Sequence, residues 1–139
     1  MSGVDVCFAG NGGREHALAC KIRESPGVGR IGATFANGGM IRDGVESIPF
    51  EVKKPEDVDP FLREMERRKY EFLVASTDDA VAAGLADEGT ARGFRVFGTK
   101  RMPGQLESDK RFAKERMREV GIPTPPWKQF KADHYPEAL

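Results

Sequence analysis

The 139-residue sequence predicts an α/β fold, a doubly wound and mainly parallel sheet of about five strands with helices on both faces. Three observations predict it. Short apolar runs alternate with longer helical patterns along the chain. Three glycines in the segment AGNGGREHAL, residues 9–18, join the first apolar run to a helical pattern, as in loops that hold a phosphate. The run FLVA, residues 72–75, is continuously apolar, as expected of a strand covered on both faces.

Five strands and four helices are expected. The strands cover residues 4–9, 30–35, 45–50, 72–75 and 94–97. The helices cover residues 15–24, 55–69, 78–92 and 105–120.

In the first half of the chain, glycine, proline and the apolar pattern indicate where the predicted strands and helices begin and end. The first strand ends at Gly10, and the helix after it places Leu18 and Ile22 on one face. The second strand leads into a turn at residues 37–39, Asn-Gly-Gly. The helix after the third strand begins at Pro55, because proline suits the first turn of a helix.

Glycine and proline also divide the second half. The alanine-rich helix after the fourth strand stops at Gly93, where the fifth strand follows. The last helix stops at Gly121 and Pro123. The tail, residues 124–139, contains the only tryptophan and no complete element of its own.

The predicted sheet also predicts where a ligand binds. In open parallel sheets, ligands bind at the carboxyl ends of the strands, near the switch in strand order. This rule marks the loops 10–14, 35–40 and 76–79, with 98–101 beside them.

Composition excludes several classes of function. Lys plus Arg equals Asp plus Glu at 22 each, so bulk attraction to nucleic acid or membrane is not expected. There is no apolar stretch of about 20 residues. Cys7 and Cys20 form no C-x-x-C and no metal-ligand spacing, so we expect reduced packing residues and no metal site. These features predict a cytoplasmic protein without nucleic-acid or membrane partners.

The glycine-rich loop fits neither a dinucleotide nor a P-loop. The third glycine of the G-x-G-x-x-G fingerprint is replaced by Glu15, and no acidic residue ends the second strand, so binding of NAD is not expected. Free backbone N–H groups at Gly12 and Gly13, with Arg14 in the first turn, would suit a compact phosphate. From the residues alone, a phosphate site and a plain tight turn with a surface arginine are equally good interpretations.

Three other polar side chains have local explanations. Asp78 and Asp79 fit the first turn of a helix with a hydroxyl N-cap, although they also face the predicted site, and both roles can hold. His16 is better explained by a hydrogen bond within the fold than as a general base, because no partner for proton transfer is apparent.

The nine residues GNGGREHAL, 10–18, resemble the opening signature of the glycinamide ribonucleotide synthetase (phosphoribosylamine–glycine ligase) family. Further matches recur in that family's order and spacing at residues 97–98, 105–107, 110–114 and 121–124. The resemblance implies a Rossmann-like pre-ATP-grasp domain that binds phosphoribosylamine at residues 1–121. Residues 122–139 would then be a linker or the start of a truncated ATP-grasp domain.

The resemblance implies an activity for the full-length protein. Members of the family are ATP-dependent carbon–nitrogen ligases that join glycine to phosphoribosylamine with ATP and magnesium in purine biosynthesis. The 139 residues alone are expected to be inactive, to hold no catalytic residue, metal or firmly bound cofactor, and to need the missing ATP-grasp portion in cis or in trans. The alternative is a stand-alone or divergent module that binds a phosphoribosyl metabolite without ligase activity.

The resemblance also implies site residues. The phosphate of the substrate would be bound by Asn11, Gly12, Gly13, Arg14 and Glu15. Its sugar and amine would be bound by Asn37, Gly38, Asp78 and Asp79, and ATP by Lys110. The family's usual Pro-Gly-Asn, Gly-Pro-Glu and Gly-Pro-Ser or Gly-Pro-Thr turns are altered at residues 35–37, 75–77 and 98–100, so a different amine substrate is an alternative.

Overall fold

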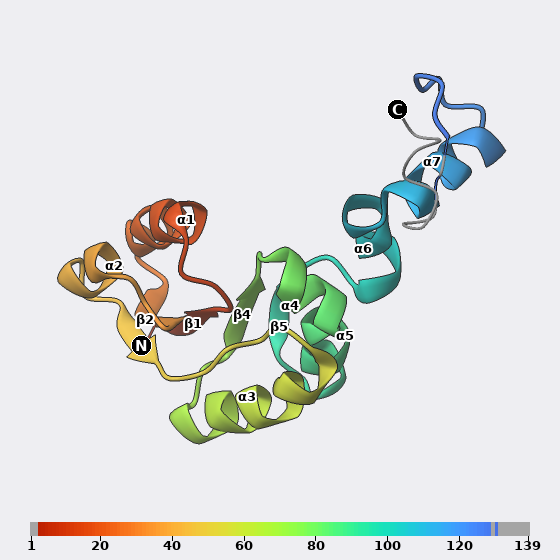
Figure 1. Ribbon diagram of the computed structural model, residues 1–139. Helices are drawn as coiled ribbons and strands as arrows, with labels where there is room; N and C mark the ends of the chain where they lie inside the picture. The colour runs from red at the N-terminus through yellow and green to blue at the C-terminus, as the bar shows by residue number, and fades with distance from the viewer. Residues whose placement is uncertain (1–2, 129, 131–139) are drawn as a thin grey trace. The chain divides into compact units, whose positions relative to one another are not determined.

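The computed structural model describes residues 3–128 and residue 130 (Figure 1). The chain divides into two compact units, Met1–Gly104 and Gln105–Leu139, and each is described by itself. No helix among the described residues is both long and apolar enough to span a membrane.

The first unit is built on a five-stranded sheet. Its strands are β1 (Val4–Phe8), β2 (Val28–Thr34), β3 (Glu46–Ile48), β4 (Phe72–Ala75) and β5 (Arg95–Gly98). All neighbouring strands are parallel, and their order is β3-β2-β1-β4-β5. The predicted doubly wound parallel sheet is therefore confirmed, and the order reverses between β1 and β4.

Helices cover both faces of this sheet (Figure 1). One face is covered by α1 (Gly13–Arg23) and α2 (Gly38–Arg42). The other is covered by α3 (Pro55–Arg68), α4 (Asp78–Ala83) and α5 (Leu85–Ala91). The helix α6 (Arg101–Ser108) spans the boundary between the two units.

The sheet separates two hydrophobic layers, and β1 contributes to both. Phe8 is fully buried in the layer beneath α1 and α2, together with Met40. Cys7 points to the opposite layer, where it joins Phe61 and Leu73, because successive side chains of a strand alternate between faces. Burial raises the pKa of the Cys7 thiol, which keeps it protonated as a packing residue.

The packing of α1 differs from the prediction. Leu18 is 40% exposed, whereas Glu15 and Ala19 are buried. The helix meets the core through the small Ala19 and the half-buried Ile22, so of the two residues of the predicted apolar face Ile22 packs as expected and Leu18 does not.

Three helix limits also differ from the prediction. The expected turn at 37–39 starts α2, because the Asn37 side chain accepts a hydrogen bond from the Met40 N–H (3.0 Å) and caps the helix. The expected helix 78–92 is two helices, since Gly84 adopts a left-handed φ of 88°. The expected helix 105–120 is interrupted at Asp109, whose carboxylate caps a new helix.

The second unit contains α7 (Lys110–Glu119), which buries none of its residues. The Lys114 ammonium donates to the Thr124 hydroxyl, and the Arg118 guanidinium lies 5.5 Å from the centre of the Trp127 ring. These contacts attach the segment after α7 to the helix.

Glu64 on α3 is expected to make the stability of the chain sensitive to acid. Its carboxylate accepts hydrogen bonds from the Nε atoms of Arg67 (2.8 Å) and Arg68 (2.5 Å), which lower its pKa from 4.5 to about 2. Since the folded state favours the charged form, this stabilisation is complete above the unfolded pKa and is lost as the pH falls towards 2.

Urea denaturation between pH 6 and pH 2, roughly the span of ordinary carboxyl titration, tests this expectation. The free energy of unfolding should decline less for Glu64→Gln than for the wild type. Glu56→Gln on the same helix should follow the wild type, and parallel curves for Glu64→Gln and wild type would contradict the prediction.

Candidate functional site

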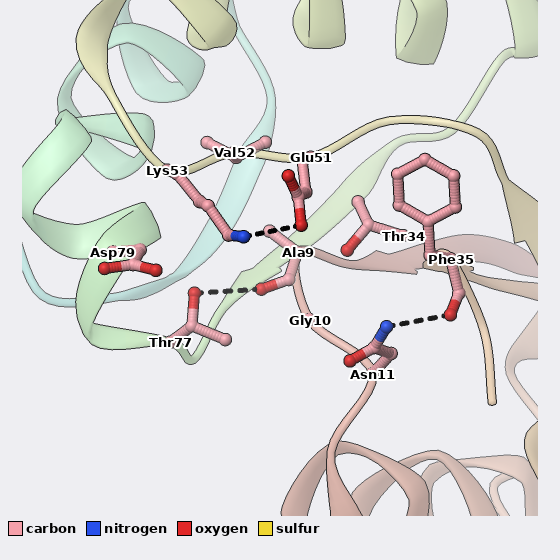
Figure 2. A pocket seen from close by; sticks show the side chains of 10 residues that line it. All are labelled: Ala9, Gly10, Asn11, Thr34, Phe35, Glu51, Val52, Lys53, Thr77 and Asp79. Carbon is pink, nitrogen blue, oxygen red and sulfur yellow. Dashed lines mark hydrogen bonds and ion pairs between the residues drawn. The ribbon is translucent and has the colours of Figure 1, made fainter.

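A pocket of about 180 Å³ lies at the carboxyl ends of the strands, where the ligand rule predicts a site (Figure 2). It is formed by the loops after β1, β2 and β4 and by the connection from β3 to α3. Its lining residues are Ala9, Gly10, Asn11, Thr34, Phe35, Glu51, Val52, Lys53, Thr77 and Asp79.

The loop after β1 passes very close to the loop after β4. Gly10 has a φ of 154°, and a Cβ atom there would lie 2.7 Å from the Thr77 Cγ2. The Thr77 hydroxyl also donates to the Ala9 carbonyl (3.3 Å). Only glycine allows this approach, so the first glycine of the signature is needed by the fold itself.

Glu15 joins the same two loops from inside the protein. It is only 3% exposed, and its carboxylate accepts hydrogen bonds from the Gly12 N–H (3.0 Å) and the Ser76 hydroxyl (2.8 Å). Glu15 thus bonds a neighbouring loop amide. The Gly12 N–H is consequently occupied, and the expectation that it is free for a ligand is wrong.

Two asparagines join the loops after β1 and β2. The Asn11 amide donates to the Phe35 carbonyl (2.8 Å), and the Asn37 amide donates to the Asn11 carbonyl (2.7 Å). Phe35 adopts a left-handed φ of 42°, and its half-exposed ring lines the pocket (Figure 2). Both asparagine side chains therefore hold the pocket wall together.

The start of α1 keeps free hydrogen-bond donors. Among the described residues, the backbone N–H groups of Gly13 and Arg14 have no partner, and neither does the exposed Arg14 guanidinium. A Cβ atom on Gly13 would meet nothing within 4 Å. This helix end can therefore bind an anion through two amides and one guanidinium.

The start of α4 contributes a carboxylate to the pocket. The Thr77 hydroxyl accepts a hydrogen bond from the Ala80 N–H (3.2 Å) as the N-cap, which confirms the predicted helix start. Asp78 and Asp79 are exposed in its first turn, and Asp79 alone of the two lines the pocket. A role for either carboxylate in binding stays a prediction.

The connection from β3 to α3 supplies residues that the sequence reasoning missed. The Lys53 ammonium lies 2.7 Å from a Glu51 carboxylate oxygen over the pocket (Figure 2), and this hydrogen bond raises the pKa of Lys53. The Asp57 carboxylate accepts from the Lys53 N–H (3.1 Å) and fixes the connection. The sequence could have indicated these residues, because every connection that follows a parallel strand starts at this edge of the sheet.

The remaining predicted residues lie outside the pocket lining. Gly38 is the exposed first residue of α2, with open space where a Cβ would be. The His16 Nε2 lies 2.7 Å from the Asp43 carboxylate, which lowers the pKa of Asp43 and confirms a hydrogen bond within the fold. Lys110 is the exposed first residue of α7, in the second unit, and its contact with ATP stays a prediction.

The fold and the glycine-rich turn after β1 define a Rossmann-like α/β domain. Solved structures that share this fold include two biotin carboxylase domains. The biotin carboxylase domain of a thermophilic 2-oxoglutarate carboxylase bound to bicarbonate matches with a TM-score of 0.60 and 18% identity, over 89% of this chain and 29% of that one. The biotin carboxylase domain of a single-chain bacterial carboxylase matches with a TM-score of 0.64 and 15% identity, over 97% of this chain and 33% of that one. These likenesses concern the fold alone.

Sequence similarity gives the family. Residues 4–107 match the family described as phosphoribosylglycinamide synthetase, N domain, and the chain belongs to that family, as the resemblance implied. It is 40% identical over 128 residues to phosphoribosylamine–glycine ligase of Ralstonia nicotianae, covering 91% of this chain and 29% of that protein. It is 37% identical over 126 residues to trifunctional purine biosynthetic protein adenosine-3 of Gallus gallus, covering 90% of this chain and 12% of that protein. The chain thus spans less than a third of either relative.

Proposed function

We propose that this chain is the N-terminal, phosphoribosylamine-binding part of a phosphoribosylamine–glycine ligase of purine biosynthesis. The full-length protein would join glycine to the amine of phosphoribosylamine with ATP and magnesium. The observation that carries the proposal is the family match over residues 4–107, which includes the glycine-rich loop beside the pocket. The limits 1–121 for this domain, and 122–139 for a linker or the start of the ATP-grasp domain, belong to the proposal.

The phosphate would bind at the start of α1. The N–H groups of Gly13 and Arg14 point from the positive end of a helix, and the Arg14 guanidinium can add a bidentate contact. The open space at Gly13 would let phosphate oxygens approach the backbone. Asn11 and Glu15 would act as positioning residues, because their side chains already hold the loops.

The sugar and amine would bind in the pocket itself. Asp79 would accept hydrogen bonds from ribose hydroxyls or from the amine, and the Lys53–Glu51 pair offers a further donor and acceptor across the pocket. Gly38 and Asp78 would border this part of the site from the ends of α2 and α4.

ATP and magnesium would be bound chiefly by the rest of the full-length protein. Among the described residues, one group of three potential metal ligands is present, namely His16, Cys20 and Asp43. Magnesium prefers oxygen ligands in an octahedral arrangement, so this group does not suit it. Lys110 would contribute a contact with a nucleotide phosphate.

Arg14→Ala is expected to weaken the binding of ribose 5-phosphate, a stable probe for the phosphoribosyl group. Loss of one charge-assisted contact should cost about 1.5–3 kcal/mol of binding free energy, measurable by isothermal titration calorimetry. Lys21→Ala, on the same helix but paired with Glu24, is the matched control and should bind as the wild type does.

Ribose without the phosphate separates a phosphate contact from a general effect. Its binding should be much weaker and indifferent to Arg14→Ala. An unchanged affinity of Arg14→Ala for ribose 5-phosphate would rule out the proposed phosphate contact.

A further inference from the structure

Three side chains that can ligate a metal meet outside the pocket, between α1 and α2. They are His16, Cys20 and Asp43, and none of them lines the pocket. We propose that they form a binding site for a divalent ion of the zinc class. This proposal does not depend on the proposed ligase function.

The backbone brings the three ligands together. His16 and Cys20 are four residues apart on α1, so they share one face of the helix. Asp43 follows the last residue of α2, which packs beside α1. The His16 Nε2 lies 2.7 Å from the Asp43 Oδ2, and the Cys20 Sγ lies 3.8 Å from the same oxygen.

The spacing of the ligand atoms suits a tetrahedral ion. The three atoms lie within 4.8 Å of one another. Zinc bonds of about 2.0–2.3 Å place tetrahedral ligand atoms roughly 3.3–3.8 Å apart. Small rotations of partly exposed side chains would therefore admit the ion, which would replace the hydrogen bond between His16 and Asp43.

The donor set selects the class of ion. Imidazole nitrogen, thiolate sulfur and carboxylate oxygen together favour zinc and cobalt over magnesium or calcium. The thiolate of Cys20 and the carboxylate of Asp43 would balance the two positive charges of the ion, and the exposed thiol can release its proton on binding. The Arg42 Nε donates to the other Asp43 oxygen (3.3 Å), which leaves Oδ2 for the ion.

Spacing along the sequence could not reveal this site. The sequence predicted no metal, because the two cysteines show no paired motif. The third ligand instead comes from the end of α2, 27 residues after His16. An ion here would tie together the two helices that cover one face of the sheet.

Cobalt titration of the tag-free, reduced 139-residue chain tests the proposal. One Co²⁺ per chain should produce visible bands of tetrahedral cobalt and a thiolate-to-cobalt charge-transfer band in the near ultraviolet, and Zn²⁺ should abolish both. Cys20→Ser should lose the charge-transfer band. By competition with a chromophoric chelator, Cys20→Ser, His16→Gln and Asp43→Asn should each bind Zn²⁺ at least about tenfold more weakly.

The matched control is His134→Gln, which removes the only other histidine of the chain and should leave cobalt and zinc binding unchanged. Cys20 is exposed, so Cys20→Ser should fold, and circular dichroism will verify this. Three results would overturn the proposal: no charge-transfer band in the wild type, a band that survives Cys20→Ser, or equal zinc affinity in His16→Gln and His134→Gln.

Discussion

Phe8→Ala is expected to lower the free energy of unfolding by about 3–5 kcal/mol, a large part of the ~5–15 kcal/mol that stabilises a typical domain. Phe8 is fully buried on β1, the central strand, where it pairs with Ala33 on one side and Val74 on the other. Small neighbours such as Ala19 and Ala33 cannot fill the space that the ring leaves. Urea denaturation followed by circular dichroism measures the change.

Phe97→Ala is the matched control for this prediction. Phe97 lies on the edge strand β5 and is 64% exposed, so its removal should change the free energy of unfolding by less than about 0.5 kcal/mol. If Phe8→Ala and Phe97→Ala lowered the free energy of unfolding by similar amounts, the prediction that burial in the hydrophobic layers stabilises the fold would be contradicted.

Glu15→Ala is expected to lower the free energy of unfolding by about 2–4 kcal/mol. The substitution removes two charge-assisted hydrogen bonds and leaves the Gly12 N–H and the Ser76 hydroxyl without their acceptor. Thermal or urea denaturation measures the loss. The free energy of unfolding of Glu15→Gln should lie between those of the wild type and Glu15→Ala, because an amide oxygen can still accept one of the two hydrogen bonds.

Glu15→Ala should also weaken the binding of ribose 5-phosphate, although the Glu15 side chain need not contact the ligand. The loops after β1 and β4 would no longer be held at their present separation. Glu24→Ala, at the exposed end of α1, serves as the control and should change stability by less than about 0.5 kcal/mol. Full stability of Glu15→Ala would show that these hydrogen bonds are dispensable.

The sheet was predictable because its signals are local. Short apolar runs mark the five strands, glycine directly borders every predicted run except residues 72–75, and the alternation of these runs with helices leads to the parallel order. What could not be predicted depends on tertiary contacts. The glycines after Asn37 suggested a turn, yet the buried Met40 and the Asn37 cap make a short helix there. The alanine-rich run concealed the break at Gly84, where the Arg101 guanidinium occupies the space of the absent side chain.

The position of the candidate site could be predicted from the sequence, whereas the hydrogen bonds of its polar groups could not. The carboxyl ends of the strands indicate three of the loops that line the pocket, since topology alone brings them together. Which polar groups are occupied depends on distances across loops. The Gly12 N–H is bonded to a carboxylate that also reaches Ser76, 61 residues away from Glu15. Lys53 was overlooked because its loop has no glycine-rich motif to draw attention to it.

The division of the site between occupied and unoccupied groups has a consequence for its evolution. Glu15, Asn11 and Asn37 are committed to hydrogen bonds between loops, so replacing them costs stability whatever the ligand. Gly13 and Asp79 have open surroundings, and among the described residues neither makes a side-chain hydrogen bond between loops. Under the proposed function, mutations at the second group would therefore change substrate preference, while selection for folding would retain the first group.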